Sequence, residues 1–318
     1  MHIPNGFLSD PVCAATTAAT VAAVAASVAR MRQQSQWANG PLLASTGAAV
    51  FAAQMVNFNV DHSSSGHLLG AGLAAIVLGP SAGVLAMAVV LLAQCLMFGD
   101  GGLTALGANV LNMGVVACLT SYGVYGLTRR AMPGKTGAIL GAGLGACGSV
   151  MAAATACSLE LAGSGTSSLS DTLSAMLGVH AVVGAVEGMA TAAFVALLTS
   201  TVPSALADPG SVARGSSKRL ASTALLGALA IAIFAAPLAS SAPDGLEKVA
   251  LTLGFADLAG PSAAWAVAPD YATPGVAWQP LAIALAGLLG VAVVYAASYA
   301  IGRTALCKAP KRRVDPRR

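Results

Sequence analysis

The sequence predicts an all-α integral membrane protein, with a bundle of about seven helices followed by a module of two more. Hydrophobic residues make up 56% of the 318 residues and charged residues only 9%, whereas soluble proteins carry about 25% charged residues. The 36 glycines, together with abundant alanine, let helices approach closely, which favours a helical bundle over a barrel. No Lys or Arg precedes the first apolar stretch, so we expect no cleavable signal peptide and an amino terminus that stays in place.

Nine segments are candidates for membrane helices, because a spanning helix needs about 20 apolar residues. The third candidate is too short to span alone, and the Gly79-Pro80 pair that follows it interrupts the helical pattern. It is either a half-helix or a helix that begins at the preceding loop. The nine helices are expected over 10–31, 41–58, 68–79, 80–98, 103–128, 136–161, 171–200, 220–238 and 279–302.

The basic residues predict an orientation, because cytoplasmic loops of membrane proteins are rich in Lys and Arg. With nine crossings and an external amino terminus, all of the 16 Lys and Arg residues except Lys248 fall inside. We therefore expect a multi-pass protein of the inner or plasma membrane, with its amino terminus extracytoplasmic and its carboxyl terminus cytoplasmic. The outer face would carry the first residues, the loop over 59–67 and a set of acidic residues: Asp61, Asp100, Asp244, Glu247, Asp257 and Asp270.

Changes in composition divide the chain into four parts. Residues 1–200 form a first membrane domain. Residues 201–219, with two prolines, several serines and three basic residues, are typical of a cytoplasmic linker. Residues 220–302 form the two-helix module, whose helices are joined by an external loop over 239–278. Residues 303–318 form a basic cytoplasmic tail that can bind anionic lipid.

Three of the four histidines lie in the first residues and in one loop, at His2, His62 and His67. The terminal amine, the His2 amide nitrogen and a His2 ring nitrogen can close fused rings around one metal ion. A second imidazole would complete four nitrogens, an arrangement that suits Ni(II) or Cu(II). Pro4 and Gly6 favour a turn that lets this end fold inward. The alternative is that His2 is simply a solvated residue.

The loop offers His67 as the second imidazole, because it stands just before an expected helix start. In the alternative interpretation Ser64 or Ser65 caps that helix and His67 has no role. Asp61 and His62 are further possible ligands or supporting residues, and an added ligand from them would tolerate a higher-coordinate Co(II). Binding would displace protons from the amine and the imidazoles, so it should weaken in acid.

His180 and Glu187 lie seven residues apart on one face of the seventh expected helix. Ionisable groups at membrane depth are costly unless they are paired, so each is a candidate functional residue or a member of a satisfied structural pair. Other polar side chains could support the metal site or simply form hydrogen bonds between helices. These are Gln54, Asn57, Ser65, Gln94, Asn109 and Asn112.

The chain contains no P-loop, HExxH, GxSxG or EF-hand pattern, so we expect no ATP hydrolysis and no enzyme. Neither a resident cofactor nor a nucleic-acid partner is expected. Two rival interpretations stay open at this point. One is a stand-alone secondary metal transporter or channel, and the other is an intramembrane enzyme that uses His180 and Glu187 with a metal. The six scattered cysteines are interpreted as buried thiols, with a Cys13–Cys157 disulfide as the alternative.

The first eight residues, MHIPNGFL, resemble the amino-terminal motif of the CbiM/NikM family, the substrate-specific components of energy-coupling-factor transporters. Asn5 stands where that family usually has Asp. Four more stretches of the first 200 residues match the family: FAAQMVNF at 51–58, SGHLLG at 65–70, FGDGGLTALGAN at 98–109 and the stretch from His180 to Glu187. The segment APDGLEKVA at 242–250 resembles the PDGLE segment of the small NikN-type partner, here fused to the carboxyl end.

The resemblance implies a seven-helix core with a two-helix accessory unit, and uptake of Ni(II) or Co(II). It implies that Met1, His2 and His67 hold the metal through the amine, the His2 amide and ring nitrogens, and the His67 ring. ATP hydrolysis would belong to two separate ATPase subunits, coupled through a separate transmembrane subunit. The stretch Asn59–His62 replaces what is often a Pro/Gly-rich segment in the family, and it adds a carboxylate and an imidazole near the site.

Overall fold

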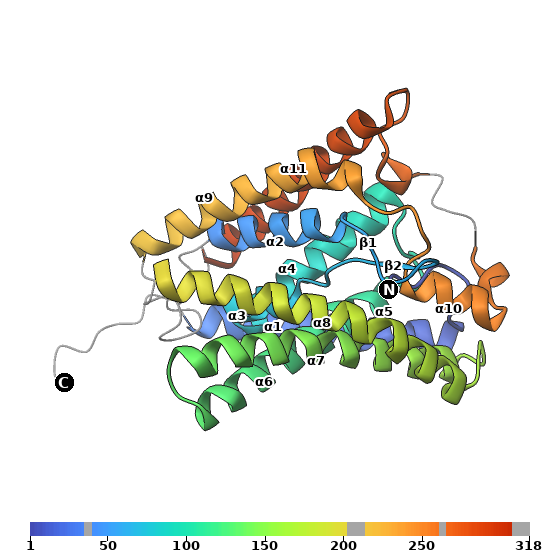
Figure 1. The fold of residues 1–318 in the computed structure, drawn as a ribbon, viewed down its shortest axis with the longest axis horizontal. Coiled ribbons are helices and arrows are strands. Elements are labelled where there is room, and N and C mark those ends of the chain that lie inside the picture. The colour runs from blue at the N-terminus through green and yellow to red at the C-terminus, as the bar shows by residue number, and fades with distance from the viewer. Residues whose placement is uncertain (35–39, 202–213, 261–264, 307–318) are drawn as a thin grey trace.

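The computed structural model describes residues 1–34, 40–201, 214–260 and 265–306, and within them the predicted all-α fold is confirmed. The helices run along the long axis of one bundle (Figure 1). Seven helical segments of this described part are long and apolar enough to cross a membrane. They are α1 (Asp10–Gln34), α4 continued by the π-helical turn η1 (Pro80–Ala93, Gln94–Phe98), α5 with η2 and α6 (Leu106–Asn109, Val110–Val116, Ala117–Ala131), α7 (Lys135–Gly163), α8 (Leu169–Thr201), α9 with η4 and η5 (Arg214–Ala230, Ile231–Ala235, Ala236–Leu238) and α11 (Gln279–Leu306).

The two remaining predicted helices are shorter. Helix α2 spans Gly40–Gln54 and α3 spans only Ala71–Leu78. The eight residues of α3 rise about 12 Å, less than half of the roughly 30 Å hydrocarbon core. Gly70 precedes α3 with a φ of 74°, so the prediction that this helix starts at residue 68 is wrong. The predicted interruption is confirmed, because Gly79 (φ 83°) separates α3 from α4.

Several short elements were not predicted. The expected helix over 41–58 ends at Gln54, and the following loop contains two antiparallel strands, β1 (Phe58–Asn59) and β2 (Ser65–Gly66). The loop expected over 239–278 contains the helix α10 (Gly245–Leu253) and the 3-10 turns η6 (Ala256–Leu258) and η7 (Pro269–Tyr271). Strands of two residues and a helix of nine are too short for hydrophobic periodicity to reveal.

The expected linker over 201–219 is helical from Arg214 onward, because α9 begins there. Its central part, 202–213, lies outside the described residues. The same holds for most of the expected tail, since α11 extends through Arg303 to Leu306 and residues 307–318 are not described. Cys13 and Cys157 are free thiols, so the alternative of a disulfide between them is not realised.

The two ends of the bundle differ in charge. The carboxyl ends of α1, α6 and α11 and the amino ends of α7 and α9 lie at one end, on the left in Figure 1. These helix ends carry Arg32, Arg129, Arg130, Lys135 and Arg303. The amino terminus, β1, β2 and α10 lie toward the other end. The five basic residues at these helix ends and the predicted metal ligands are therefore at opposite ends of the bundle, whereas Lys248 lies on α10.

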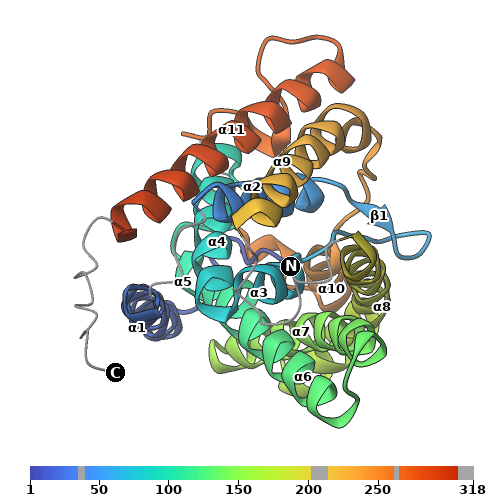
Figure 2. The ribbon, with the colours of Figure 1, turned by 90° about the vertical axis from the view of Figure 1, so that its left-hand side faces the viewer.

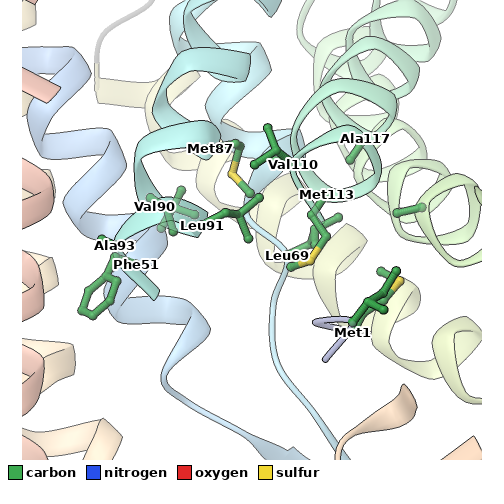
Figure 3. Packing of buried hydrophobic residues seen from close by; sticks show 14 of the residues in the cluster. Met1, Phe51, Leu69, Met87, Val90, Leu91, Ala93, Val110, Met113 and Ala117 are labelled. Carbon is green, nitrogen blue, oxygen red and sulfur yellow. The ribbon is translucent and has the colours of Figure 1, made fainter. Parts of the chain in front are cut away.

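The first residues of the chain belong to the hydrophobic core. Met1, Ile3, Phe7 and Leu8 are all buried, and Figure 3 shows Met1 within the same cluster as residues of α4 and η2. In contrast, α1 lies at the periphery of the bundle, as Figure 2 shows in cross-section, and only 11% of its apolar window is buried. The chain thus enters the bundle at its first residue, and then passes to an outer helix.

Candidate metal-binding site

The amino-terminal segment is held in place by hydrogen bonds to its backbone. The Ile3 N–H donates to Asn109 Oδ1 (2.8 Å), and the Ile3 carbonyl accepts from Asn109 Nδ2 (3.0 Å) and from the Gly102 N–H (2.8 Å). Asn5 Oδ1 accepts from both the backbone N–H and the hydroxyl of Thr104. A side chain at position 102 would collide with the backbone of Asn5, which explains the glycine there. Met1 and His2 therefore have a fixed position.

Two amide side chains that contact this segment, those of Gln94 and Asn109, lie at or next to π-helical turns. Gln94 is the first residue of η1, and Asn109 directly precedes η2. π-Helical turns within α-helices occur frequently at functional sites. Here the turn at Gln94 lies beside His2, and the turn after Asn109 lies beside Ile3.

The terminal amine forms a buried ion pair. The Met1 amine donates to Asp244 Oδ2 at 2.6 Å, and Asp244 is the N-cap of α10, where it forms a capping box with Glu247. Burial lowers the pKa of the amine, but the attraction of Asp244 outweighs it, and the net pKa is raised. Burial likewise raises the pKa of Asp244, while the neighbouring amine brings it well below its usual range. The amine is thus charged and partnered.

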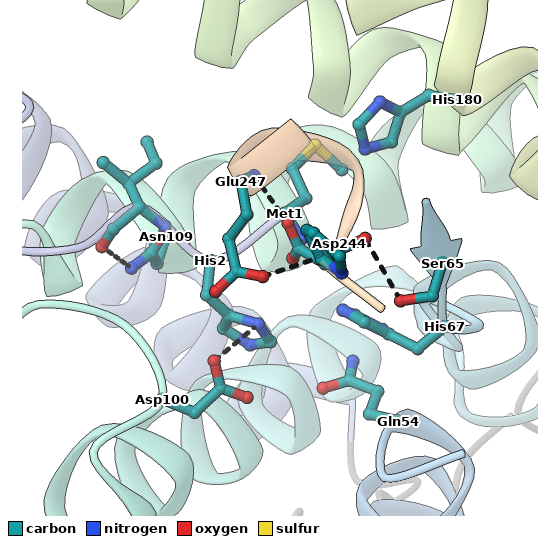
Figure 4. A network of polar contacts seen from close by, with 12 residues as sticks. Met1, His2, Gln54, Ser65, His67, Asp100, Asn109, His180, Asp244 and Glu247 are labelled. Atoms are coloured by element: carbon teal, nitrogen blue, oxygen red, sulfur yellow. Dashed lines mark hydrogen bonds and ion pairs between the residues drawn. The ribbon is translucent and has the colours of Figure 1, made fainter. Parts of the chain in front are cut away.

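The His2 ring lies between two partners. Its Nε2 is 3.1 Å from Gln94 Oε1, and its Nδ1 is 3.1 Å from Asp100 Oδ1. Each partner is itself held, because Gln94 Nε2 donates to Gln54 Oε1 (2.8 Å) and the Tyr271 hydroxyl donates to Asp100 Oδ2 (2.6 Å). Burial lowers the pKa of His2, opposed by Asp100. The polar network around the ring is drawn in Figure 4.

His67 stacks beside His2, with ring centroids 5.4 Å apart and ring planes at 28°. Burial lowers its pKa to about 4, so the ring is neutral near pH 7. Its Nδ1 pairs with the Leu68 carbonyl at 3.0 Å and must be the donor, which leaves Nε2 as an acceptor with a free lone pair. That Nε2 is buried and has no hydrogen-bond partner among the residues that the structure describes. A buried nitrogen lone pair without a partner is a ready ligand for a metal ion.

The backbone after His67 is held by two buried side chains. The carboxyl oxygens of Glu187 accept from the N–H groups of Leu69 and Gly70, each at 2.7 Å. Gln54 Nε2 donates to the Leu69 carbonyl at 2.6 Å. Glu187 on α8 and Gln54 on α2 therefore position the loop that carries His67.

The other predicted supporting residues surround the same loop. Ser65 bonds to the segment before α10 through its N–H and hydroxyl. The Nδ1 of His180 donates to the Met176 carbonyl, and its ring lines a small cavity together with Met1 and His67. Asn57 lines the larger groove described below. His180 and Glu187 bind separate partners, the Met176 carbonyl and the N–H groups of Leu69 and Gly70.

Asp61 and His62 lie apart from this network. Both are exposed at the turn between β1 and β2, and neither lines the cavities next to His67. The Asp61 carboxylate accepts from the Ser63 N–H (2.6 Å), and this backbone hydrogen bond lowers the pKa of Asp61. The structure thus brings together Met1, His2 and His67, and it places the two possible additional ligands at the surface.

A groove of about 730 Å³ reaches the donor atoms. His2 and His67 line it, together with the carboxylates of Asp100, Asp244, Glu247 and Asp270. A second cavity of about 10 Å³, lined by Met1, His67, His180 and Asp244, is the size of one water molecule. In the described part of the chain, no three side chains among His, Cys, Asp and Glu are placed to hold a metal ion.

The contacts of Asp100, Asp244 and Tyr271 with the site were not predicted from the sequence. Asp244 is 243 residues from Met1, and no local pattern reveals such a contact. The available signal was the spacing Asp244-x-x-Glu247, which is typical of a capping box and would have placed a helix start in the expected loop.

Comparisons with known proteins give the family. The model of the CbiM family, described as "Cobalt uptake substrate-specific transmembrane region", matches residues 2–205. The model of the PDGLE domain matches residues 218–306. The putative fused nickel transport protein NikMN of Archaeoglobus fulgidus is 36% identical over 315 residues, covering 96% of this chain and 99% of the relative. The fused nickel transport protein NikMN of Rhodobacter capsulatus is 34% identical, covering 98% and 99%.

Among solved structures, one titled as a transition metal transporter is 31% identical with a TM-score of 0.57, and the match covers 63% of this chain and 93% of that chain. This structural likeness and the two domain matches agree with one another. The relatives are named as transport proteins and not as enzymes. The chain therefore belongs to the CbiM family, with a PDGLE domain fused to the carboxyl end of the CbiM region.

Proposed function

We propose that this chain is the metal-capturing membrane subunit of an energy-coupling-factor transporter that imports Ni(II) or Co(II). The observation that carries the proposal is the neutral, buried Nε2 of His67, which lies beside His2 and Met1 and has no hydrogen-bond partner in the described part of the chain. The nickel and cobalt transport proteins among the relatives support the choice of cargo. ATP hydrolysis would belong to two ATPase subunits, coupled to this chain through a separate transmembrane subunit.

The donor set consists of four nitrogens: the Met1 amine, the His2 amide and ring nitrogens, and His67 Nε2. Four nitrogens in a plane suit Ni(II). Binding requires the amine and the amide to lose protons, so metal capture releases protons to the groove. The carboxylates along the groove attract the hydrated cation and lead it to His2 and His67.

The charge of the bundle supports extracytoplasmic capture. Basic residues gather at the end opposite the donor atoms, and such residues are enriched on the cytoplasmic side of membrane proteins. The amino terminus and the groove would then face outward.

The chelate is tested by blocking and then restoring the terminal amine. A purified protein with a few residues ahead of Met1, removable by a protease that leaves Met1 first, is titrated with NiCl₂ by calorimetry before and after cleavage. We expect high-affinity binding only after cleavage, because the extension converts the amine into an amide and displaces it. Equally tight binding by the extended protein contradicts the chelate. The same residues appended after Arg318 serve as the control.

The dependence on partner subunits is tested separately by nickel uptake into cells that express this chain with and without the ATPase subunits. We expect uptake to require them. Uptake that continues unchanged in their absence would favour the stand-alone transporter or channel.

A further inference from the structure

We propose that Asp244, which belongs to the PDGLE domain, is a positioning residue for the Met1 amine, so that the carboxyl-terminal domain completes the metal site. This inference rests on the proposed function, because it concerns the same donor atom. Its starting point is the ion pair at 2.6 Å between Met1 and Asp244. The pair joins the first residue of the CbiM region to a residue in the fused domain.

The Asp244 carboxylate is itself held rigidly. Its Oδ1 accepts from the Glu247 N–H at 2.9 Å, which leaves Oδ2 for the amine. The carboxylate of Glu247 accepts in return from the Asp244 N–H at 2.9 Å. The amino end of α10 also favours a negative charge at this position. Asp244 is therefore held in place independently of the amine that it contacts.

The start of α10 is attached to the loop that carries His67. The Ser65 N–H donates to the Pro243 carbonyl at 2.8 Å, and the Ser65 hydroxyl donates to the Ala242 carbonyl at 2.7 Å. Ser65 is two residues before His67, and Pro243 directly precedes Asp244. The carboxylate that holds the amine and the imidazole that would share the metal are therefore fixed relative to each other.

The PDGLE domain reaches the second residue of the chelate as well. The Tyr271 hydroxyl donates to Asp100 Oδ2 at 2.6 Å, and Asp100 Oδ1 contacts His2 Nδ1. The Tyr271 ring stacks on Phe98 with centroids 4.7 Å apart, which fixes the hydroxyl. Contacts from one domain thus reach both Met1 and His2, through two separate carboxylates.

The chemistry allows Asp244 to act with the metal bound. An amine that coordinates a metal through its lone pair keeps two N–H bonds, and one of them can still donate to Asp244 Oδ2. The same carboxylate then orders the chain end before binding and orients the ligand afterwards. Carboxylates that hydrogen-bond to a metal ligand in this way commonly contribute about 10- to 100-fold to metal affinity.

The test is the Asp244→Asn variant of the full-length protein in detergent, titrated with NiCl₂. Asn is as good an N-cap as Asp, so α10 is preserved while the charge that faces the amine is removed. We expect the dissociation constant for Ni(II) to rise about 10- to 100-fold. We also expect the absorption of the bound Ni(II) to lose the planar four-nitrogen signature of the wild type, because the amine is no longer held. Asp257→Asn is the matched control. Asp257 on η6 is exposed and does not line the groove, so the same change of side chain removes a negative charge from the PDGLE domain and leaves the amine contact intact.

Wild-type affinity and spectrum in Asp244→Asn would overturn the inference. Equal weakening by both variants would also overturn it, because the effect would then come from lost charge in the PDGLE domain and not from the amine contact. The removable amino-terminal extension decides a different question. If the extension leaves nickel binding intact, the chelate itself is wrong, whatever Asp244 does.

Discussion

The two halves of the loop between α2 and α3 contrast sharply, although each carries one histidine. Residues 61–63 are exposed, and the hydrogen bonds of Asp61 stay within the turn. Residues 64–67 are buried and are tied to the PDGLE domain, while the following Leu69 and Gly70 are tied to α2 and α8. His62 and His67 are five residues apart, yet only His67 stacks on His2.

This contrast shows what makes a histidine a candidate ligand. An exposed imidazole is satisfied by water, whereas a buried imidazole without a partner has lost that solvation. The cost of burying His67 Nε2 is recovered only when something binds to it. The two histidines differ in burial and in how firmly the surrounding backbone is held. The following predictions test whether that difference decides nickel binding.

The largest effect is expected from His67→Ala. The substitution removes one of the four proposed nitrogen donors, so nickel affinity should fall by more than the roughly 100-fold that is the upper range for a supporting residue. Calorimetric titration of the untagged protein with NiCl₂ measures this change. A reduction no larger than that caused by His62→Ala would show that the buried half of the loop has no special role.

A smaller effect is expected from Glu187→Gln. A glutamine offers only one acceptor oxygen to the two N–H donors of Leu69 and Gly70, so one buried donor loses its partner. Such a loss costs about 1–3 kcal/mol of stability. We expect a lower thermal unfolding temperature and roughly tenfold weaker nickel binding, because the backbone after His67 is loosened.

The matched control for this prediction is Glu160→Gln. Glu160 is also a carboxyl group on a membrane helix, and it accepts from Asn112 Nδ2 at 2.6 Å, but it does not contact the loop. Its substitution should leave nickel affinity unchanged. Equal weakening of nickel binding by both variants would contradict a specific role for Glu187.

Much of the fold could be predicted because membrane helices leave a strong signal in hydropathy. The long segments follow from that signal, and the interruption at Gly79 follows from the Gly79-Pro80 pair. Two features depend on local geometry that hydropathy does not report. The helix α3 begins only after Gly70 because that residue takes a positive φ, and the nine residues of α10 are too few for hydropathy to reveal a helix.

The candidate site was predictable in part. The chelating capacity of an amine followed by His2 is a property of adjacent residues, so the sequence alone suggests it. His67 became a candidate because it precedes an expected helix start, although α3 begins only at Ala71. The contacts of Asp244 and Tyr271 depend on how the PDGLE domain packs against the CbiM region. Such contacts between distant segments are set by tertiary packing, and no spacing along the chain encodes them.

The smallest effect is expected from His62→Ala. His62 is exposed at the turn between β1 and β2, and it lines neither cavity next to His67. Substitutions at such surface positions usually change stability by about 0.5 kcal/mol or less. Nickel affinity and the unfolding temperature should both stay near the wild-type values in the same titration and melting experiments. A large loss of affinity would mean that the turn folds over the site when metal binds, and then the contrast between the two halves of the loop would hold only for the metal-free protein.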